Sequence, residues 1–525
     1  MRTIFIVSLM TIYSCSGDAK FGTGSAQKTD EEVIVGEDAQ FENVPTFECF
    51  KKPSVLPKQT LEPELLFDWN YGAETYNQVM ATPAVAEFKT GEPRIIFSAF
   101  SPTESYRKAA KTIAIDGKTG ETVWTSDIEV SSRTTPALGD INGDGKIEVV
   151  VSGFDEYLYA LDDEGTQIWK SESTGLSTSG ATLADLDGDG ETEIIVGENV
   201  FTSAGKDKFK ISGDGQAIRD IRSEEGLEIV SAVGIYSGLD GKEFCRFVAP
   251  PEGFEYREAS IAVGKLVEKS SHSSVVMIDF PLEVTDPTGS KTALELADER
   301  FEKITHVYIF NADTCAKERQ FEVPYEGTGR KAGGGPVNLA DIDGDGDLEI
   351  AFAGRHYYTV FEADGTLIWK NPTQDFSSAA TGSSSFDFNG DGKLELVYND
   401  EQFLRVFNGQ TGAVVYEYAN ISGTLVEYPV IADVNADGHA NVVVAANNYG
   451  NRDGVTGIRV FKGKDNLWTK TRKLWNQYSY IPSLINDDYT FSNGSEDESD
   501  AVSSQRIGFR NNTAIIKFDD PVLCE

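Results

Sequence analysis

One nine-residue stretch, residues 341–349, places oxygen-bearing side chains at alternate positions. Asp341, Asp343 and Asp345 alternate with other residues, Gly346 follows them, and Glu349 closes the stretch. This alternation predicts that the three aspartates face the inside of one tight loop, because glycine lets the backbone turn there without a Cβ clash. The carbonyl of Asp347 then points inward. Such a cage offers only oxygen ligands, which suit a hard cation, and calcium better than magnesium.

The same pattern occurs at four other places, and its positions are numbered one to nine below. Positions one, three, five and nine would supply side-chain oxygens, and position seven a backbone carbonyl. The expected ligands are Asp140, Asn142, Asp144, Lys146 and Glu148; Asp185, Asp187, Asp189, Glu191 and Glu193; Asp341, Asp343, Asp345, Asp347 and Glu349; Asp387, Asn389, Asp391, Lys393 and Glu395; and Asp433, Asn435, Asp437, His439 and Asn441. The last copy is weaker because it ends in Asn.

A metal-free Asx-type turn is the alternative for these loops, since Asp, Asn and Gly are common in turns. Charge argues against it. Unit charges about 4 Å apart repel by roughly 1 kcal/mol in water and about 4 kcal/mol near a protein surface. Several carboxylates in one loop therefore favour a bound cation, and we expect four to five structural calcium ions.

The loops are not EF-hands, which need a glutamate at position twelve between two helices. Position twelve is Val151, Val196, Phe352 or Tyr398 in the four full copies. Each loop is followed by an apolar, β-rich run such as 148–151. The loops are therefore expected to join two strands.

The copies recur with a regular period. Asp341 to Asp387 and Asp387 to Asp433 are each 46 residues apart. Each period contains four short apolar runs, which is the size of one propeller blade. Degenerate units start at Thr82 and Asp220; the third strand of the latter is expected at 306–310, so that 234–303 would be an insertion. This count predicts seven blades, with 65–69 completing the last blade and closing the ring.

The nonapeptides and their strands resemble the FG-GAP repeats of integrin-alpha-type propellers, which are often described as VCBS-like in bacteria. The resemblance covers roughly residues 61–465. It implies an all-β, seven-bladed β-propeller of four-stranded blades with calcium-binding hairpin loops. The stretches 116–124 and 364–369 also resemble quinoprotein-type propeller repeats, although no quinone-binding set is visible. Trp124, Trp169 and Trp369 recur at one place in their blades, which indicates packing between blades rather than ligand stacking.

The chain ends differ from the repeats. Residues 1–14 are expected to be an export signal, since the apolar run is too short to span a membrane. Residues 12–15 resemble a bacterial lipobox, which implies lipidation of Cys15; an ordinary signal peptide is the alternative. Residues 15–60 are predicted to be a flexible polar tether. Residues 466–525 form a C-terminal tail, which resembles one seen after such propellers in bacterial surface proteins.

The other four cysteines are expected to form two disulfides in an oxidising compartment, Cys49–Cys524 and Cys245–Cys315. Unpaired buried thiols are the alternative.

Charge and composition exclude several functions. The formal net charge is −39 and the sequence pI is about 4.4, which excludes nucleic acid as a partner. The histidines are His272, His306, His356 and His439, and none has zinc-ligand spacing. No nucleophile elbow, P-loop or dinucleotide fingerprint occurs. A coordinated carboxylate is a poor acid or base, so no catalytic residue is predicted.

The sequence therefore favours a non-catalytic, calcium-stabilised propeller that presents a rigid surface to protein or glycan at the cell envelope. Its membrane contact would be the N-terminal lipid alone, at the outer membrane or cell surface; a periplasmic or secreted location is the alternative. Residues 234–303 are the candidate for partner binding, as long insertions often carry function. A polysaccharide lyase or hydrolase and a periplasmic outer-membrane assembly scaffold are the rival functions, because propellers host unrelated activities.

Overall fold

The computed structural model describes residues 61–70, 75–172, 180–222, 226–256, 261–282, 291–450, 452–492 and 508–512. The chain divides into two units, residues 58–516 and residues 1–57 with 517–525. The second unit lies outside the described residues, and with it the predicted signal, tether, Cys15 and the Cys49–Cys524 pair.

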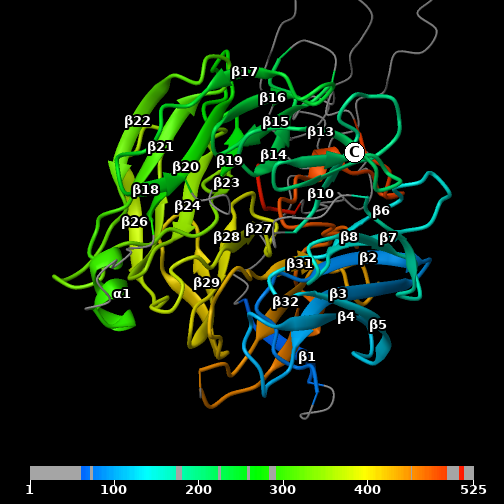
Figure 1. Cartoon of the computed structure of the whole chain (residues 1–525). Helices are drawn as coiled ribbons and strands as arrows, with labels where there is room; N and C mark the ends of the chain where they lie inside the picture. Colours follow the sequence, from blue (N-terminus) through cyan, green and yellow to red (C-terminus); the bar gives the residue numbers. More distant parts are fainter. Residues whose placement is uncertain are drawn as a thin grey trace, which may run out of the picture. The chain divides into compact units, whose positions relative to one another are not determined.

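The described strands form eight antiparallel sheets, which are the blades of one propeller (Figure 1). Blade 1 contains β2 (Ala84–Lys89), β3 (Glu92–Phe100), β4 (Ala109–Asp116) and β5 (Thr122–Ser131). Blade 2 contains β6 (Ala137–Gly139), β7 (Glu148–Ser152), β8 (Leu158–Leu161) and β9 (Gln167–Lys170). Blade 3 contains β10 (Thr182–Ala184), β11 (Glu193–Val196), β12 (Asn199–Phe201) and β13 (Asp207–Lys210). Blade 4 contains β14 (Gly215–Arg219), β15 (Glu228–Ser231), β16 (Gly234–Ser237) and β17 (Glu243–Arg246).

Blade 5 has five strands, because β18 and β19 both pair with β20. It contains β18 (Phe254–Tyr256), β19 (Ala262–Gly264), β20 (Ser274–Pro281), β21 (His306–Asn311) and β22 (Lys317–Glu322), with helix α1 (Ala293–Phe301) between β20 and β21. Blade 6 contains β23 (Asn338–Ala340), β24 (Glu349–Ala353), β25 (Tyr357–Phe361) and β26 (Leu367–Pro372). Blade 7 contains β27 (Ser383–Phe386), β28 (Glu395–Asn399), β29 (Phe403–Asn408) and β30 (Val414–Ala419). Blade 8 contains β31 (Val430–Ala432), β32 (Asn441–Ala446), β33 (Gly457–Gly463) and β1 (Pro63–Trp69).

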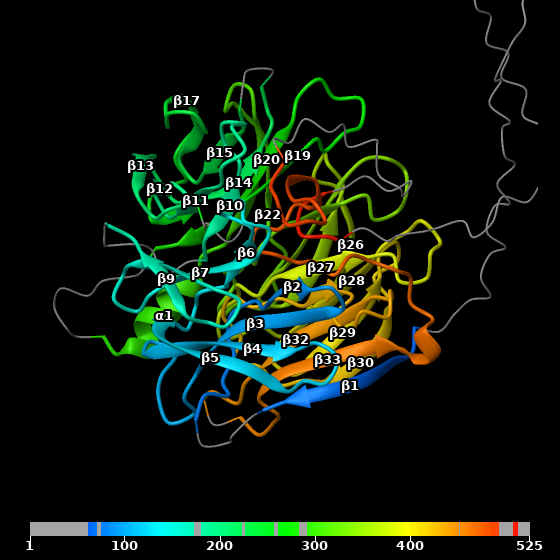
Figure 2. The same ribbon diagram turned by 90° about the vertical axis from the view of Figure 1, so that its right-hand side faces the viewer.

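The ring closes by pairing the two ends of the propeller. β1 lies antiparallel to β33, with Phe67 opposite Val460 and Trp69 opposite Ile458; Figure 2 shows the two strands together. This confirms the prediction that 65–69 completes the last blade. Closure leaves only short sheet edges open to other chains.

The predicted number of seven blades is wrong, and so is the insertion at 234–303. The third strand of the Asp220 unit is β16, not β21, and β17 completes blade 4. Residues 254–322 then form a whole additional blade. Its split first strand and its lack of an acidic nonapeptide removed both signals on which the sequence count depended.

Neighbouring blades are joined by an aromatic side chain that covers a glycine. The Trp124 indole of blade 1 donates to the Asp163 carbonyl of blade 2 at 2.9 Å. A Cβ added at Gly165, whose φ is +79°, would lie 2.5 Å from the Trp124 ring. Trp169 on Gly205 and Trp369 on Gly412 repeat this arrangement. The recurring tryptophans therefore pack between blades, as predicted.

The described part of the C-terminal region, residues 468–492 and 508–512, lies against the first strands of six blades, and we call it the plug. It includes the 3₁₀ helix η3 (Pro482–Leu484) and follows η2 (Lys464–Asn466). Trp475 and Val85 exchange backbone hydrogen bonds of 2.8 and 2.9 Å, and Phe509 and Leu339 exchange bonds of 3.2 and 2.8 Å. The further contacts are Leu138 with Asn476, Leu183 with Gln477, Ser385 with Asn511 and Ile431 with Asn512. First strands line a propeller's axis, so the chain fills its own centre here.

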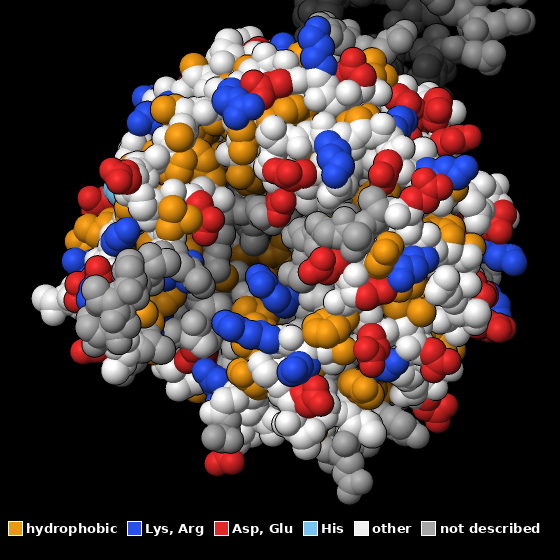
Figure 3. Space-filling view, viewed as in Figure 1, with side chains coloured by type: hydrophobic (Ala, Val, Ile, Leu, Met, Phe, Trp, Pro, Cys, Tyr) orange, Lys and Arg blue, Asp and Glu red, His pale blue; other side chains and the backbone are white. Residues whose placement is uncertain are grey.

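The propeller has two faces with different loops. The hairpins between first and second strands, which hold the acidic nonapeptides, emerge on one face, called the acidic-loop face. Hairpins between second and third strands, and the connections between blades, emerge on the opposite face, where α1 lies; Figures 1 and 3 look onto this face. No helix among the described residues is long and apolar enough to cross a membrane.

Candidate metal-binding loops

The acidic loops share one backbone framework, built on the aspartate at position one. In the blade 2 loop, Asp140 Oδ1 accepts the Gly143 N–H at 2.8 Å and Oδ2 accepts the Gly145 N–H at 2.9 Å. Asp185, Asp341 and Asp387 accept the corresponding pairs of N–H groups. Each carboxylate thus fixes the turn and keeps further lone pairs for a ligand.

Position nine closes the loop from the following strand. Its Oε2 accepts the N–H of position two: Glu148 from Ile141 at 3.0 Å, Glu193 from Leu186 at 2.8 Å, Glu349 from Ile342 at 2.6 Å and Glu395 from Phe388 at 3.1 Å. Burial raises the pKa of Glu148 to about 7 and the pKa of Glu349 and Glu395 to about 8, and neighbouring carboxylates of each loop add to the rise. A nearby cation would keep these carboxylates ionised at neutral pH.

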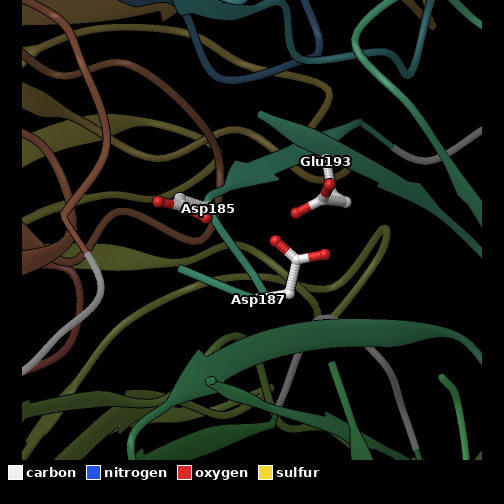
Figure 4. A group of neighbouring side chains, drawn as sticks. All are labelled: Asp185, Asp187 and Glu193. Carbon is white, nitrogen blue, oxygen red and sulfur yellow. The ribbon is translucent and has the colours of Figure 1, made fainter. Parts of the chain in front are cut away.

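Two of the loops bring three carboxylates together. The ligand oxygens of Asp185, Asp187 and Glu193 all lie within 4.8 Å of one another, and so do those of Asp341, Asp343 and Glu349. Figure 4 shows the Asp187 and Glu193 carboxylates pointing toward each other. These two groups could hold a metal ion, and their all-oxygen chemistry is compatible with calcium.

The loops differ in the charge of the side chain at position three, which is a neutral amide in some and a carboxylate in others. Asn142 Nδ2 donates to Glu148 at 3.0 Å and Asn389 Nδ2 donates to Glu395 at 3.2 Å. Asp343 cannot donate in this way. Among the described residues no Lys or Arg forms an ion pair with the blade 6 triad Asp341, Asp343 and Glu349, whereas Lys208 pairs with two carboxylates of the blade 3 triad.

Position seven keeps its backbone in the loop, with its N–H on the aspartate at position five. These donors are Lys146, Glu191, Asp347, Lys393 and His439, at 2.8 to 3.0 Å. The side chain of position seven is therefore not needed inside the loop, which agrees with its variable residue type.

The blade 8 loop does not fit a cation as well as the others. Asn441 Oδ1 takes the place of the glutamate oxygen and accepts the Val434 N–H at 2.9 Å. Its Nδ2 is buried and has no hydrogen-bond partner in the part of the chain that the structure describes, and an amide nitrogen is not a ligand for a hard cation. The His439 ring contacts the Trp468 carbonyl of the plug at 2.6 Å.

The loops also connect blades. The carbonyl of position two accepts an N–H from the next blade: Leu186 from Leu227 at 2.8 Å and Ile342 from Leu394 at 3.0 Å. The donors occupy position eight of their own units. A loop that is held in place by a cation therefore also holds the joint to its neighbour.

One glutamate that corresponds to position nine was not predicted from the sequence. In blade 4, Glu228 Oε2 accepts the Ile221 N–H at 2.7 Å, as position nine does elsewhere, and burial raises its pKa to about 7. The eight-residue spacing from Asp220 to Glu228 was the available signal. The predicted cysteine pair Cys245 and Cys315 forms a disulfide, which links β17 of blade 4 to the β21–β22 turn of blade 5.

Comparison with known proteins agrees with this architecture. The family model of the FG-GAP-like repeat matches residues 140–196 and 341–398, which contain four of the acidic loops. The crystal structure of the V. cholerae biofilm matrix protein Bap1 superposes with a TM-score of 0.66 and 19% sequence identity, covering 86% of this chain and 99% of that one. The exotype rhamnogalacturonan lyase YesX superposes with a TM-score of 0.50 and 13% identity, covering 74% and 72%.

No curated protein sequence matches the chain. At these identities the structural likenesses show the fold alone. The chain therefore contains FG-GAP-like repeats within a β-propeller of eight four- or five-stranded blades.

Proposed function

We propose that the protein is a non-catalytic binding propeller of the cell envelope or extracellular matrix, stabilised by calcium and directed at acidic glycans. The observation that carries this proposal is the set of cationic side chains stacked on aromatic rings on the face opposite the acidic loops. The likeness to a biofilm matrix protein supports export and adhesion as its setting.

Calcium is assigned first to the blade 6 loop. Its three carboxylates gather without an ion pair to any described Lys or Arg, so a divalent ion would remove their mutual repulsion. The blade 2 and blade 7 loops follow, because rotation of the Asn142 and Asn389 amides would present an oxygen in place of the nitrogen. The metal has a structural role here: it holds the loops and, through them, the joints between blades.

The opposite face carries cations in an otherwise acidic protein. The Arg107 guanidinium lies 5.6 Å from the Tyr106 ring centroid, and the Lys331 ammonium lies 5.1 Å from that of Tyr325. Both pairs stand in connections that emerge on this face, β3–β4 and β22–β23. In Figure 3, Lys and Arg side chains gather along the lower side of a central hollow.

This combination fits a sugar polymer with carboxylate groups. Aromatic rings provide flat apolar contact for sugar rings, and Lys or Arg pairs with the carboxylate. The net charge of −39 works against nonspecific binding of polyanions, so any such binding has to come from a local surface.

Retention on immobilised polygalacturonate, with dextran as the neutral comparison, tests the proposal. The calcium-loaded protein should bind the acidic polymer, and the double substitution Arg107→Glu with Lys331→Glu should weaken binding by about tenfold or more. Lys118→Glu is the matched control, because Lys118 is exposed in the β4–β5 turn on the acidic-loop face. Equal retention of all three proteins, or none by the wild type, would refute an acidic-glycan surface.

A polysaccharide lyase is the second candidate, and His356 is the observation that favours it. His356 lies in the β24–β25 turn on the same face, with its ring 5.6 Å from that of Phe376. Burial and the neighbouring Arg355 lower its pKa, so the imidazole is neutral and able to accept a proton. Release of unsaturated products from polygalacturonate, lost in His356→Gln, would establish the lyase; no release supports the binder.

A further inference from the structure

The blade 3 loop differs from the other acidic loops because a lysine reaches into it. Lys208, on β13 of the same blade, places its Nζ 2.7 Å from Asp187 Oδ2 and 2.7 Å from Glu193 Oε1. These are two of the three carboxylates that gather in this loop. Glu193 is almost fully buried, and the Lys208 side chain is mostly buried.

A β-bulge positions this lysine. Val200 pairs with Phe209 and Phe201 pairs with Asp207, so Lys208 is the extra residue between them. The bulge recurs at the same place in the blades that carry the other full loops. Its extra residue is Ile168 in blade 2, Ile368 in blade 6 and Val415 in blade 7. Blade 3 therefore has a cation where its three counterparts have an aliphatic side chain.

The ammonium satisfies the same requirements as a small cation. It carries positive charge, donates hydrogen bonds to two carboxylates and lies between position three and position nine. A divalent ion coordinated by Asp187 and Glu193 would need the same oxygens and would be repelled by a lysine at this distance. The two cations are therefore mutually exclusive in this loop.

We propose that Lys208 is the resident cation of the blade 3 loop, so that this loop is closed by the chain's own ammonium and takes up no calcium. The consequence is a ring with two kinds of joint. The joint from blade 3 to blade 4, through the Leu186 carbonyl, persists when metal is removed, whereas the joint from blade 6 to blade 7 depends on metal. The inference rests on the proposed calcium binding of the other loops.

Metal counting tests it. The purified chain is equilibrated in calcium-containing buffer, separated from free metal by gel filtration and analysed for calcium by elemental emission. Lys208→Met should bind one more calcium ion per chain than the wild type. Lys210→Met is the matched control, because Lys210 is exposed at the end of the same strand and its loss should leave the count unchanged.

The reciprocal variant keeps the test independent of how well Lys208→Met folds. Ile368→Lys places a lysine at the bulge of blade 6 and should bind one ion fewer than the wild type. An unchanged count in both Lys208→Met and Ile368→Lys overturns the proposal, since calcium would then displace the lysine. A wild type that binds no calcium at all would instead refute the metal role proposed above, and a gain in Lys208→Met would still support the assignment of Lys208.

Discussion

Replacing Asp343 by Asn should stabilise the metal-free protein, and calcium should reduce or cancel that gain. The substitution gives the blade 6 loop the residue that other loops already have at position three, Asn142 in blade 2 and Asn389 in blade 7. In the metal-free protein it removes the repulsion of Asp343 with Asp341 and with Glu349. It also allows an amide to donate to Glu349, as Asn142 does to Glu148 at 3.0 Å.

The magnitude follows from the geometry. The ligand oxygens lie within 4.8 Å of one another, where each pair of unit charges repels by about 3.5 kcal/mol at an effective dielectric of 20 and about 0.9 kcal/mol in water. Asp343 is partly exposed, so we expect a gain of about 1–3 kcal/mol for the metal-free variant. In calcium the variant loses an anionic ligand, and a tenfold weaker affinity removes about 1.4 kcal/mol of stabilisation, so the gain in calcium should be smaller than the gain in chelator by about that amount.

Urea unfolding followed by tryptophan fluorescence measures both effects. The measurement belongs at a pH of about 9, above the pKa of about 8 of Glu349, because a proton would otherwise relieve the repulsion. Asp187→Asn is the control: Asp187 is paired with Lys208, so its loss should destabilise the metal-free protein. A loss of stability for Asp343→Asn in chelator, or a gain in calcium as large as the gain in chelator, would refute the charge argument.

Three other outcomes are expected. The urea midpoint of the metal-free protein should rise as the pH is lowered from about 9 to about 6. Burial raises the pKa of Glu349 and of Glu395 to about 8 in the folded state, against 4.5 in the unfolded state. Folding therefore takes up protons in this window, and the free energy of unfolding falls as the pH rises through it. Saturating calcium should suppress this slope; a slope unaltered by calcium would contradict it. Gly165→Ala should lower the free energy of unfolding by about 1–2 kcal/mol because of its positive φ, and by a further 1–3 kcal/mol because the new Cβ overlaps the Trp124 ring. Gly327→Ala, with φ of +75° and open space around it, should lose only the roughly 1–2 kcal/mol that comes from φ. Equal losses of the two variants in thermal unfolding would show that Trp124 does not pack tightly on Gly165. Trp475→Ala should destabilise the ring by about 3–5 kcal/mol, because its fully buried indole lies 4.7 Å from the Tyr480 ring, while Leu467→Ala, at an exposed site, should change the midpoint little.

Local sequence patterns predicted the features that one blade determines by itself. The acidic nonapeptides, the hairpins that hold them and the recurring tryptophans each follow from residues within one period. Closure by β1 was also predictable, because 65–69 matched a fourth strand that lacked its first three. The blade count failed at blade 5, whose first strand is divided into β18 and β19 and whose first hairpin has no acidic motif. Without either signal, its strands could not be separated from those of blade 4.

The plug and Lys208 could not be predicted for a different physical reason. The plug bonds through the backbone of an irregular segment, for example Trp475 with Val85, and backbone pairing leaves no residue signature. Lys208 follows a strand pattern in which a lysine is unremarkable on the exposed edge of a blade. Only the register of the bulge places its ammonium between Asp187 and Glu193.

One motif thus supports three ways of handling the same charge. Besides the backbone N–H of position two, position nine receives a side-chain amide in blades 2 and 7 and an ammonium in blade 3, whereas in blade 6 no described side chain donates to it. Metal removal should therefore destabilise some loops more than others, although all of them have the same pattern of backbone hydrogen bonds. The Ile342 carbonyl links the blade 6 loop to Leu394 at 3.0 Å, and the Leu186 carbonyl links the blade 3 loop to Leu227 at 2.8 Å. Chelation should accelerate amide hydrogen exchange much more at Leu394 than at Leu227. Equal acceleration at the two amides would mean that Lys208 does not take the place of calcium in the blade 3 loop.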